Sequence, residues 1–180
     1  MCTVTISRVP FVVISGPPGS GKSTLATALS VELELPLISK DKIKEALLTV
    51  LSVADSASSQ ELGRASMAVL FQLARDSAVG AVLEANFRRS KSIEQLQALN
   101  GRVVEIHCRC DRSVALDRYR SRQKTRHPGH FDALRSEAEL WDIDMVGPLA
   151  GDWAVVEVDT NIQVDASATA RAVRELLSVP

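Results

Sequence analysis

A run of nine residues near the start of the chain has the types and spacing of a phosphate-binding loop. The run consists of Gly16, Pro17, Pro18, Gly19, Ser20, Gly21, Lys22, Ser23 and Thr24. It matches the pattern G-x-x-x-x-G-K-S/T, with the apolar run 11–14 before it and the helix-like segment 22–33 after it. Glycines let the backbone curl so that successive N–H groups point inward at phosphate oxygens, and a following helix adds its positive dipole end. The run predicts binding of a nucleoside triphosphate, with Lys22 on the β- and γ-phosphates and Ser23 on Mg²⁺.

Asp41 follows the second apolar run, 35–38, in the segment Ser39-Lys40-Asp41. Ligands of open α/β sheets bind outside the carboxyl ends of the strands, which places Asp41 beside the expected γ-phosphate. A carboxylate there can accept the proton of a hydroxyl group that receives the phosphate. Capping the next helix is the commoner role of such an aspartate, and the two roles are compatible because capping uses one carboxylate oxygen.

The third apolar run, 81–84, ends in Glu84, and polar residues continue beyond it. An acidic residue that ends a strand beside a phosphate loop commonly orients Mg²⁺ or its water shell. The alternative is a carboxylate that is simply solvated at the strand end. Asn86 and Arg88 are predicted to contact the acceptor substrate in the same cleft, as is Lys44.

Three arginines, Arg118, Arg122 and Arg126, are spaced four residues apart and would form one stripe on a helix. Such a stripe can fold over a triphosphate and neutralise charge on the transferred group. The alternative is an exposed amphipathic helix in which Asp111 and Asp117 satisfy some of the arginines. We expect the three arginines to belong to a lid over the phosphates.

Five apolar, strand-like runs alternate with segments of helical periodicity, which predicts a parallel sheet with helices on both faces. The runs span 11–14, 35–38, 81–84, 103–108 and 153–158. Ser58-Ser59-Gln60-Glu61 has the form of a capping box for the helix after the serine-rich stretch 52–59. Neither this stretch nor the break at 127–130 is long enough for a linker, so we expect one domain over 1–180 with a helical lid around 111–145.

Composition narrows the possible partners. The 21 Lys and Arg nearly balance the 22 Asp and Glu, so no overall field recruits nucleic acid or a membrane. The three cysteines, Cys2, Cys108 and Cys110, lack zinc-like spacing, and the N-terminus lacks the pattern of a signal peptide. We therefore expect a reduced, cytoplasmic protein, with Cys108 on a buried strand face. His127 and His130 have no evident third ligand, so a role in a turn or beside the substrate is favoured over a metal site.

These motifs together resemble a group of small P-loop kinases that includes chloramphenicol phosphotransferase, zeta-toxin-like kinases and the kinase module of polynucleotide kinases. The matching segments are 16–24, 39–41, 82–87, 118–130 and 159–160. The resemblance implies the three-layer α/β sandwich of P-loop NTPases, a five-stranded parallel sheet, ATP and Mg²⁺ as cofactors, and a base at Asp41. It also implies lid arginines that clamp the phosphates and a contact of Thr160 with the adenine. Two positions depart from the group: Lys44 stands where polynucleotide kinases often have arginine, and Glu84 where relatives often have aspartate.

The predicted function is therefore ATP-dependent transfer of the γ-phosphate to a hydroxyl of a small molecule. Asp41 would act as the base, while Lys22, Arg118 and Arg122 stabilise charge on the transferred group. A nucleotide or polynucleotide 5′-hydroxyl is an alternative acceptor, which Lys44 and the scarcity of stacking aromatic residues disfavour. A second alternative is a regulatory protein that hydrolyses ATP slowly, in which the acid and the arginines would be incidental.

Overall fold

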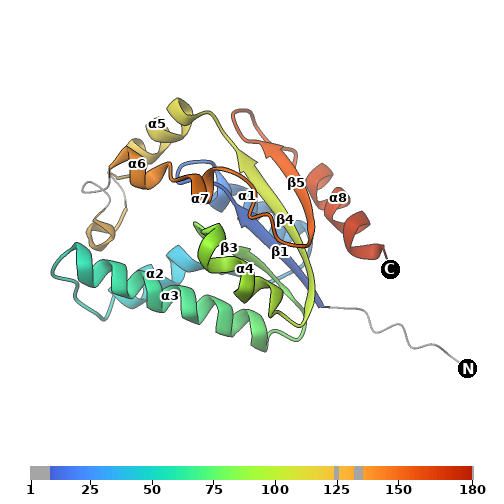
Figure 1. The fold of residues 1–180 in the computed structure, drawn as a ribbon, viewed down its shortest axis with the longest axis horizontal. Helices are drawn as coiled ribbons and strands as arrows, with labels where there is room; N and C mark the ends of the chain where they lie inside the picture. The colour runs from blue at the N-terminus through green and yellow to red at the C-terminus, as the bar shows by residue number, and fades with distance from the viewer. Residues whose placement is uncertain (1–8, 124–125, 132–135, 180) are drawn as a thin grey trace, which may run out of the picture.

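A five-stranded parallel sheet forms the centre of the molecule, with the order β2-β3-β1-β4-β5 (Figure 1). The computed structural model describes residues 9–123, 126–131 and 136–179. The predictions about the N-terminal residues, Cys2 included, lie outside these ranges. The strands are β1 (Val9–Ser15), β2 (Leu37–Ser39), β3 (Ala81–Glu84), β4 (Gly101–Arg109) and β5 (Ala154–Asp159).

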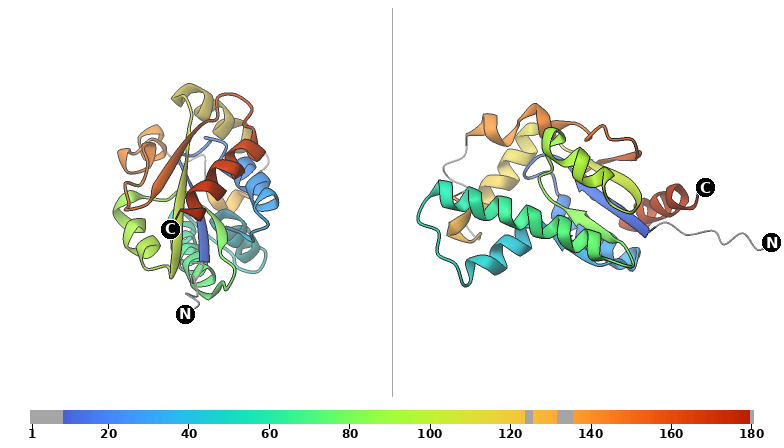
Figure 2. Two further views of the ribbon diagram at one scale, coloured as in Figure 1. Left: turned by 90° about the vertical axis from the view of Figure 1, so that its right-hand side faces the viewer. Right: turned by 60° about the horizontal axis from the view of Figure 1, so that its bottom comes forward.

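Helices cover both faces of the sheet. They are α1 (Lys22–Glu32), α2 (Lys40–Leu48), α3 (Ser56–Asp76), α4 (Arg89–Gln97), α5 (Arg112–Gln123), the short 3₁₀ helix η1 (Pro128–His130), α6 (Glu137–Leu140), α7 (Ile143–Val146) and α8 (Ala166–Ser178). One face packs against α1 and α8, and the other against α3 and α4 (Figure 2). Within the described residues, no helix has the length and apolar character needed to cross a membrane.

The two cores follow from the alternation of side chains along β1. Phe11 and Val13 pack into the cluster under α3 and α4, whereas Val12 and Ile14 pack into the cluster with α1 and α8. Because successive strand residues point to opposite faces, a strand buried on both faces reads as a continuous apolar run. Cys108 lies on a buried face of β4, as predicted, with no exposed surface.

The predicted fold class is confirmed, and the five strands lie where the apolar runs placed them to within a few residues. The predicted capping box at 58–61 is wrong. Helix α3 begins earlier, at Ser56, with Asp55 as its N-cap. The Asp55 carboxylate accepts from the Ser58 N–H over 2.8 Å, and the Ser58 hydroxyl in turn accepts from the Asp55 N–H over 3.2 Å. Asp55, and not Ser58, caps the helix because a carboxylate accepts this bond more strongly than a serine hydroxyl does.

A buried polar network interrupts the core below the end of β1. Glu105 of β4 has no exposed surface, and its carboxylate accepts from the Ser15 hydroxyl over 2.5 Å and the Leu149 N–H over 2.9 Å. It also accepts from Trp153 Nε1 over 3.0 Å. His107, on the same face of β4, lies 2.9 Å from the Ser15 hydroxyl through Nδ1. The network ties the segment before β5 to the strand end from which the phosphate-loop segment begins.

Replacing Glu105 with alanine removes the acceptor of three donors, of which the Ser15 hydroxyl and the Leu149 N–H are buried. We expect the free energy of unfolding to fall by roughly 3 kcal/mol, because each unpaired buried donor costs about 1–3 kcal/mol. Urea denaturation measures this change. Glu157→Ala, at an exposed position of β5, is the control and should change stability by less than about 0.5 kcal/mol. A loss below 1 kcal/mol in Glu105→Ala contradicts the network's role.

His107 gives a pH dependence of stability with a definite sign. Burial lowers the pKa of His107 from its usual 6.5. Below pH 6.5 the unfolded chain binds a proton that the folded chain does not, so this contribution is complete above pH 6.5 and is lost as the pH falls. Between pH 7.5 and 5.5, the free energy of unfolding should fall more in the natural protein than in His107→Gln. Urea denaturation measures both proteins. An equal fall in the free energy of unfolding in the two would rule out this contribution of His107.

Candidate active site

The segment between β1 and α1 has the backbone that a phosphate cradle requires. Gly16, Gly19 and Gly21 have φ angles of 129°, 82° and 81°, in the region that favours glycine. At Gly19 an added Cβ would lie 2.1 Å from the carbonyl oxygen of Ala115 in α5, so the loop also touches the lid helix. Gly21 is the N-cap of α1 and has no side chain to cap it, which leaves the first N–H groups of the helix for a ligand.

A cavity of about 250 Å³ opens beside this loop. It brings together most of the residues that the sequence predicts for the site. Its lining consists of Gly19, Gly21, Lys22, Ser23, Thr24, Asp41, Glu84, Asn86, Arg118 and Arg122. These residues come from the carboxyl ends of β1, β2 and β3 and from α5, which is where the strand-edge rule places a ligand.

Lys22 is the buried cation of the cavity. Its side chain is nearly fully buried, and Nζ donates to the carbonyl oxygen of Pro17 over 2.7 Å. Burial lowers the pKa of Lys22, and the negative charge of Glu84 opposes this shift. A partly desolvated ammonium group interacts strongly with an anion, because water screens the attraction less there.

Glu84 is held by two hydroxyl groups. One carboxylate oxygen accepts from Ser23 Oγ over 3.2 Å, and the other accepts from Ser39 Oγ over 2.5 Å. Only 4% of Glu84 is exposed, so the alternative of a solvated strand-end carboxylate is wrong. A serine hydroxyl and a carboxylate in one cavity are the oxygen ligands that Mg²⁺ takes from proteins when phosphates and water supply the rest. Ser23 and Glu84 therefore fit the predicted metal site.

Asp41 lines the same cavity and lies in the first turn of α2. The N-cap of this helix is Ser39, so the alternative role of Asp41 as the cap is wrong. Lys40 Nζ lies 3.2 Å from Oδ1, and Arg126 forms an ion pair with Oδ2. Burial raises the pKa of Asp41, but the charges of Lys40 and Arg126 outweigh burial and hold the pKa below its usual range. The carboxylate is therefore ionised, as a proton acceptor must be.

Two of the three predicted lid arginines face the cavity. Arg118 donates to the Thr160 carbonyl oxygen over 2.9 Å, and the guanidinium carbon of Arg122 lies 6.0 Å from the centre of the Tyr119 ring. The described part of α5 reaches Gln123, and the N–H of Arg126 donates to the carbonyl oxygen of Arg122 over 3.1 Å. Arg126 pairs with the carboxylate of Asp41 instead of lining the cavity. Its predicted phosphate contact stays a prediction.

The other arginines of α5 show why the exposed-helix alternative is only partly right. Arg112 and Arg120 form ion pairs with Glu137 of α6 over 3.1 Å and 2.8 Å. Arg120 also lies 4.0 Å from Asp117. The helix therefore has one side held by carboxylates and another that presents arginines to the cavity.

Thr160 lies beside Gly21 of the phosphate loop. Its hydroxyl donates to the Arg109 carbonyl oxygen over 2.9 Å, and its Cβ would lie 3.6 Å from a Cβ built on Gly21. The side chain is buried, and the carbonyl oxygen accepts from Arg118. This position beside the loop is compatible with the predicted adenine contact, which stays a prediction.

Two predicted acceptor contacts are not brought to the cavity. Lys44 is buried, and its ammonium group donates to the Ser59 hydroxyl over 2.6 Å. Arg88 forms an ion pair of 2.5 Å with Asp142. Both cations are therefore directed at protein partners, and no local pattern predicts these pairs because the partners are 15 and 54 residues away. Asn86 does line the cavity.

Sequence reasoning assigned no side-chain role to two residues that hold the site together. The hydroxyl of Ser39 bonds to Glu84. Glu45 lies 3.2 Å from His130 Nε2 and 3.9 Å from Arg126. Glu45 is one turn beyond Asp41 on α2, and this spacing was the available signal. Through Glu45, His130 and η1 are fixed to the helix that carries Asp41.

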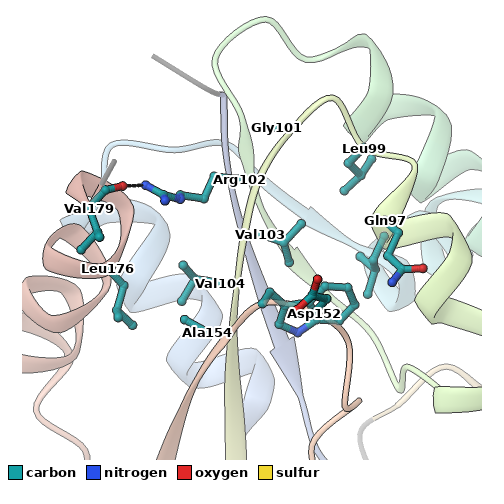
Figure 3. Close-up of a pocket in the computed structure, with 12 residues that line it drawn as sticks. Gln97, Leu99, Gly101, Arg102, Val103, Val104, Asp152, Ala154, Leu176 and Val179 are labelled. Atoms are coloured by element: carbon teal, nitrogen blue, oxygen red, sulfur yellow. Dashed lines mark hydrogen bonds between the residues drawn. The ribbon is translucent and has the colours of Figure 1, made fainter. Parts of the chain in front are cut away.

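A second cavity, of about 600 Å³, lies at the other end of β4 (Figure 3). Its lining combines apolar residues, such as Leu96 and Leu176, with the polar residues Gln97, Arg102 and Asp152. The side chain of Arg102 points toward α8, where it donates to carbonyl oxygens of the chain's C-terminal end. This cavity is larger than the one beside the phosphate loop, but it does not contain the predicted catalytic groups.

Comparisons with known proteins identify the family and the fold. Residues 11–140 match the model of a family described as an AAA domain, and the chain belongs to this family. No curated protein matches the sequence. A candidate kinase from Chloroflexus aurantiacus has a TM-score of 0.82 and 28% identity, over 94% of this chain and 98% of that one.

Two more distant structures have the same fold. A shikimate kinase from Acinetobacter baumannii, in complex with shikimate, has a TM-score of 0.58 and 18% identity, over 95% of this chain and 94% of its own. An APS kinase from Mycobacterium tuberculosis, in complex with AMPPNP and APS, has a TM-score of 0.61 and 18% identity, over 96% and 99%. The chain is therefore a P-loop NTPase with the fold of small kinases.

Lys22→Ala should weaken ATP binding by about 2 kcal/mol, or roughly thirtyfold in Kd, because it removes a charged hydrogen-bond donor. Lys42→Ala changes an exposed lysine of α2 and should leave the Kd unaltered. Isothermal titration calorimetry measures both. Equal affinities in the two variants would contradict the assignment of Lys22.

Proposed function

We propose that the protein is an ATP-dependent kinase that transfers the γ-phosphate to a hydroxyl of a small-molecule acceptor. One observation carries the proposal: the carboxylate of Asp41 lines the same cavity as Lys22 and Ser23 of the phosphate loop. A protein that only binds or slowly hydrolyses ATP does not need a carboxylate on the acceptor side. Phosphate transfer to an alcohol does, because the hydroxyl proton must have an acceptor.

The phosphate loop and its neighbours would hold the nucleotide. Lys22 and the N–H groups at the start of α1 would contact the phosphates, and Arg118 and Arg122 would approach them from α5. Thr160 would lie beside the adenine. Ser23 and Glu84 would hold Mg²⁺, which neutralises charge on the phosphates when it is bound with ATP.

Asp41 would act on the acceptor hydroxyl. Its carboxylate is ionised and is held by Lys40 and Arg126, so it is placed in one orientation before the acceptor arrives. The proton of the hydroxyl would pass to Asp41 as the oxygen bonds to phosphorus and the bond to ADP breaks. Asn86, which lines the cavity, is the predicted polar contact to the acceptor.

A small acceptor has more support than a polynucleotide. Lys44 and Arg88, which a basic track to Asp41 would need, are directed at Ser59 and Asp142. The fold neighbours include kinases solved with shikimate and with APS, which are small molecules. The resemblance of the motifs to chloramphenicol phosphotransferase, whose acceptor is also small, points the same way.

The direct test is to incubate the protein with Mg²⁺, γ-labelled ATP and a panel of small alcohols, such as sugars, sugar acids, nucleosides and aminocyclitols. Mass spectrometry then identifies any phosphorylated product. The proposal expects label on one class of hydroxyl compound. Steady hydrolysis of ATP at the same rate with every compound would favour a regulatory ATPase and overturn the proposal.

Asp41→Asn separates binding from transfer. The amide keeps the size of the side chain but cannot take up the proton, so we expect phosphate transfer to fall at least 100-fold. The Kd for ATP should change by less than about threefold, because Asp41 makes no predicted nucleotide contact. Asp117→Asn, on the exposed side of α5, is the matched control and should keep full activity. Near-normal transfer by Asp41→Asn would remove Asp41 from the role of base.

A further inference from the structure

Ser39 lies between Glu84, the predicted metal ligand, and the helix that carries Asp41, the predicted base. It is the last residue of β2 and pairs with Glu84 of β3 across the sheet. Its hydroxyl donates to Oε2 of Glu84 over 2.5 Å. Ser39 is only 5% exposed and Glu84 4%, so water has little access to replace this bond.

The same hydroxyl also begins the helix that carries Asp41. It is the N-cap of α2 and accepts the Lys42 N–H at 3.5 Å. A serine hydroxyl has one proton and two lone pairs, so it can donate to Glu84 and accept from α2 together. Asp41 lies two residues further along the chain. Ser39 thus joins the end of β3 to the first turn of α2.

The orientation of the Glu84 carboxylate depends on this bond. Its other oxygen, Oε1, accepts from Ser23 Oγ over 3.2 Å, so a hydroxyl contacts each oxygen. Side chains that hold a metal ligand through hydrogen bonds fix its direction, and their loss typically lowers metal affinity 10- to 100-fold. Without Ser39, the carboxylate would be free to turn away from Ser23.

We propose that Ser39 is a positioning residue for Mg²⁺. Its hydroxyl orients the Glu84 carboxylate toward Ser23 and keeps that carboxylate at a fixed position relative to Asp41. The inference rests on the proposed function, because it assigns a partner to the metal ligand of that same site. It predicts that the hydroxyl of Ser39 matters for Mg²⁺ much more than for ATP itself.

The test compares Ser39→Ala with Ser39→Thr by isothermal titration calorimetry of ATP, once with Mg²⁺ and once with EDTA. In Ser39→Ala, the gain in ATP affinity that Mg²⁺ gives should shrink about tenfold. The Kd in EDTA should change less than about twofold, since Ser39 makes no predicted nucleotide contact. Ser39→Thr keeps the hydroxyl and should restore the gain to within about threefold. In phosphate-transfer assays, the Mg²⁺ concentration for half-maximal rate should rise about tenfold in Ser39→Ala only.

Ser66→Ala is the matched control, because Ser66 is fully buried and its hydroxyl donates within α3, over 2.7 Å to Leu62. It should leave Mg²⁺ dependence unchanged. An unchanged Mg²⁺ dependence in Ser39→Ala, whether or not thermal stability falls, overturns the inference while the proposed function stands. If Ser39→Ala does not fold, Ser39→Cys keeps the volume with a weak donor and carries the same expectation. A natural protein that binds no ATP overturns both proposals.

Discussion

Backbone N–H groups at the start of α1 have no side chain to cap them, and the site is arranged around this open helix end. Gly21 is the cap residue and has no side chain, while Gly16 and Gly19 have the positive φ angles that form the turn. Such an end binds anions, because its partial positive charge and free donors point the same way. The loop leaves β1, the central strand of the sheet. Strands on both sides therefore end beside it, and their terminal residues surround the anion site.

The charges near this helix end compensate one another before any ligand binds. Lys22 is buried, and the negative charges of Glu84 and Asp41 both favour its protonated form. Asp41 is in turn held by Lys40 and Arg126. A buried charge without such partners would be costly, since transfer from water disfavours every ion. The cavity can therefore keep cations and carboxylates close together.

The sequence alone predicts the parts of this site that depend on local spacing. The phosphate loop is continuous, and Asp41 and Glu84 each follow an apolar run, so the carboxyl-edge rule places them together. The roles of residues whose partners are distant in the chain are not predicted by local spacing. Glu105 sits in an apolar run and is satisfied by Leu149 and Trp153, more than forty positions away.

The same limit explains the two predicted acceptor contacts that lie elsewhere. Lys44 and Arg88 have the charge that an anionic acceptor would need. Their partners, Ser59 and Asp142, are supplied by other elements of the fold. No periodicity in the sequence records such a pairing. The position of a residue in the chain therefore predicts the edge of the sheet at which it lies. It does not predict which side chain forms an ion pair or hydrogen bond with it.

Arginines between positions 118 and 126 lie both beside the phosphate loop and beside Asp41. Arg118 and Arg122 face the cavity from α5, whereas Arg126 pairs with Asp41 and lies 3.9 Å from Glu45. Two unit charges 4 Å apart near a protein surface interact by about 4 kcal/mol before desolvation is counted. Any movement of α5 that also displaces Arg126 would weaken this interaction at Asp41. One short segment of chain therefore carries both the arginines that line the cavity and the arginine that holds the Asp41 carboxylate.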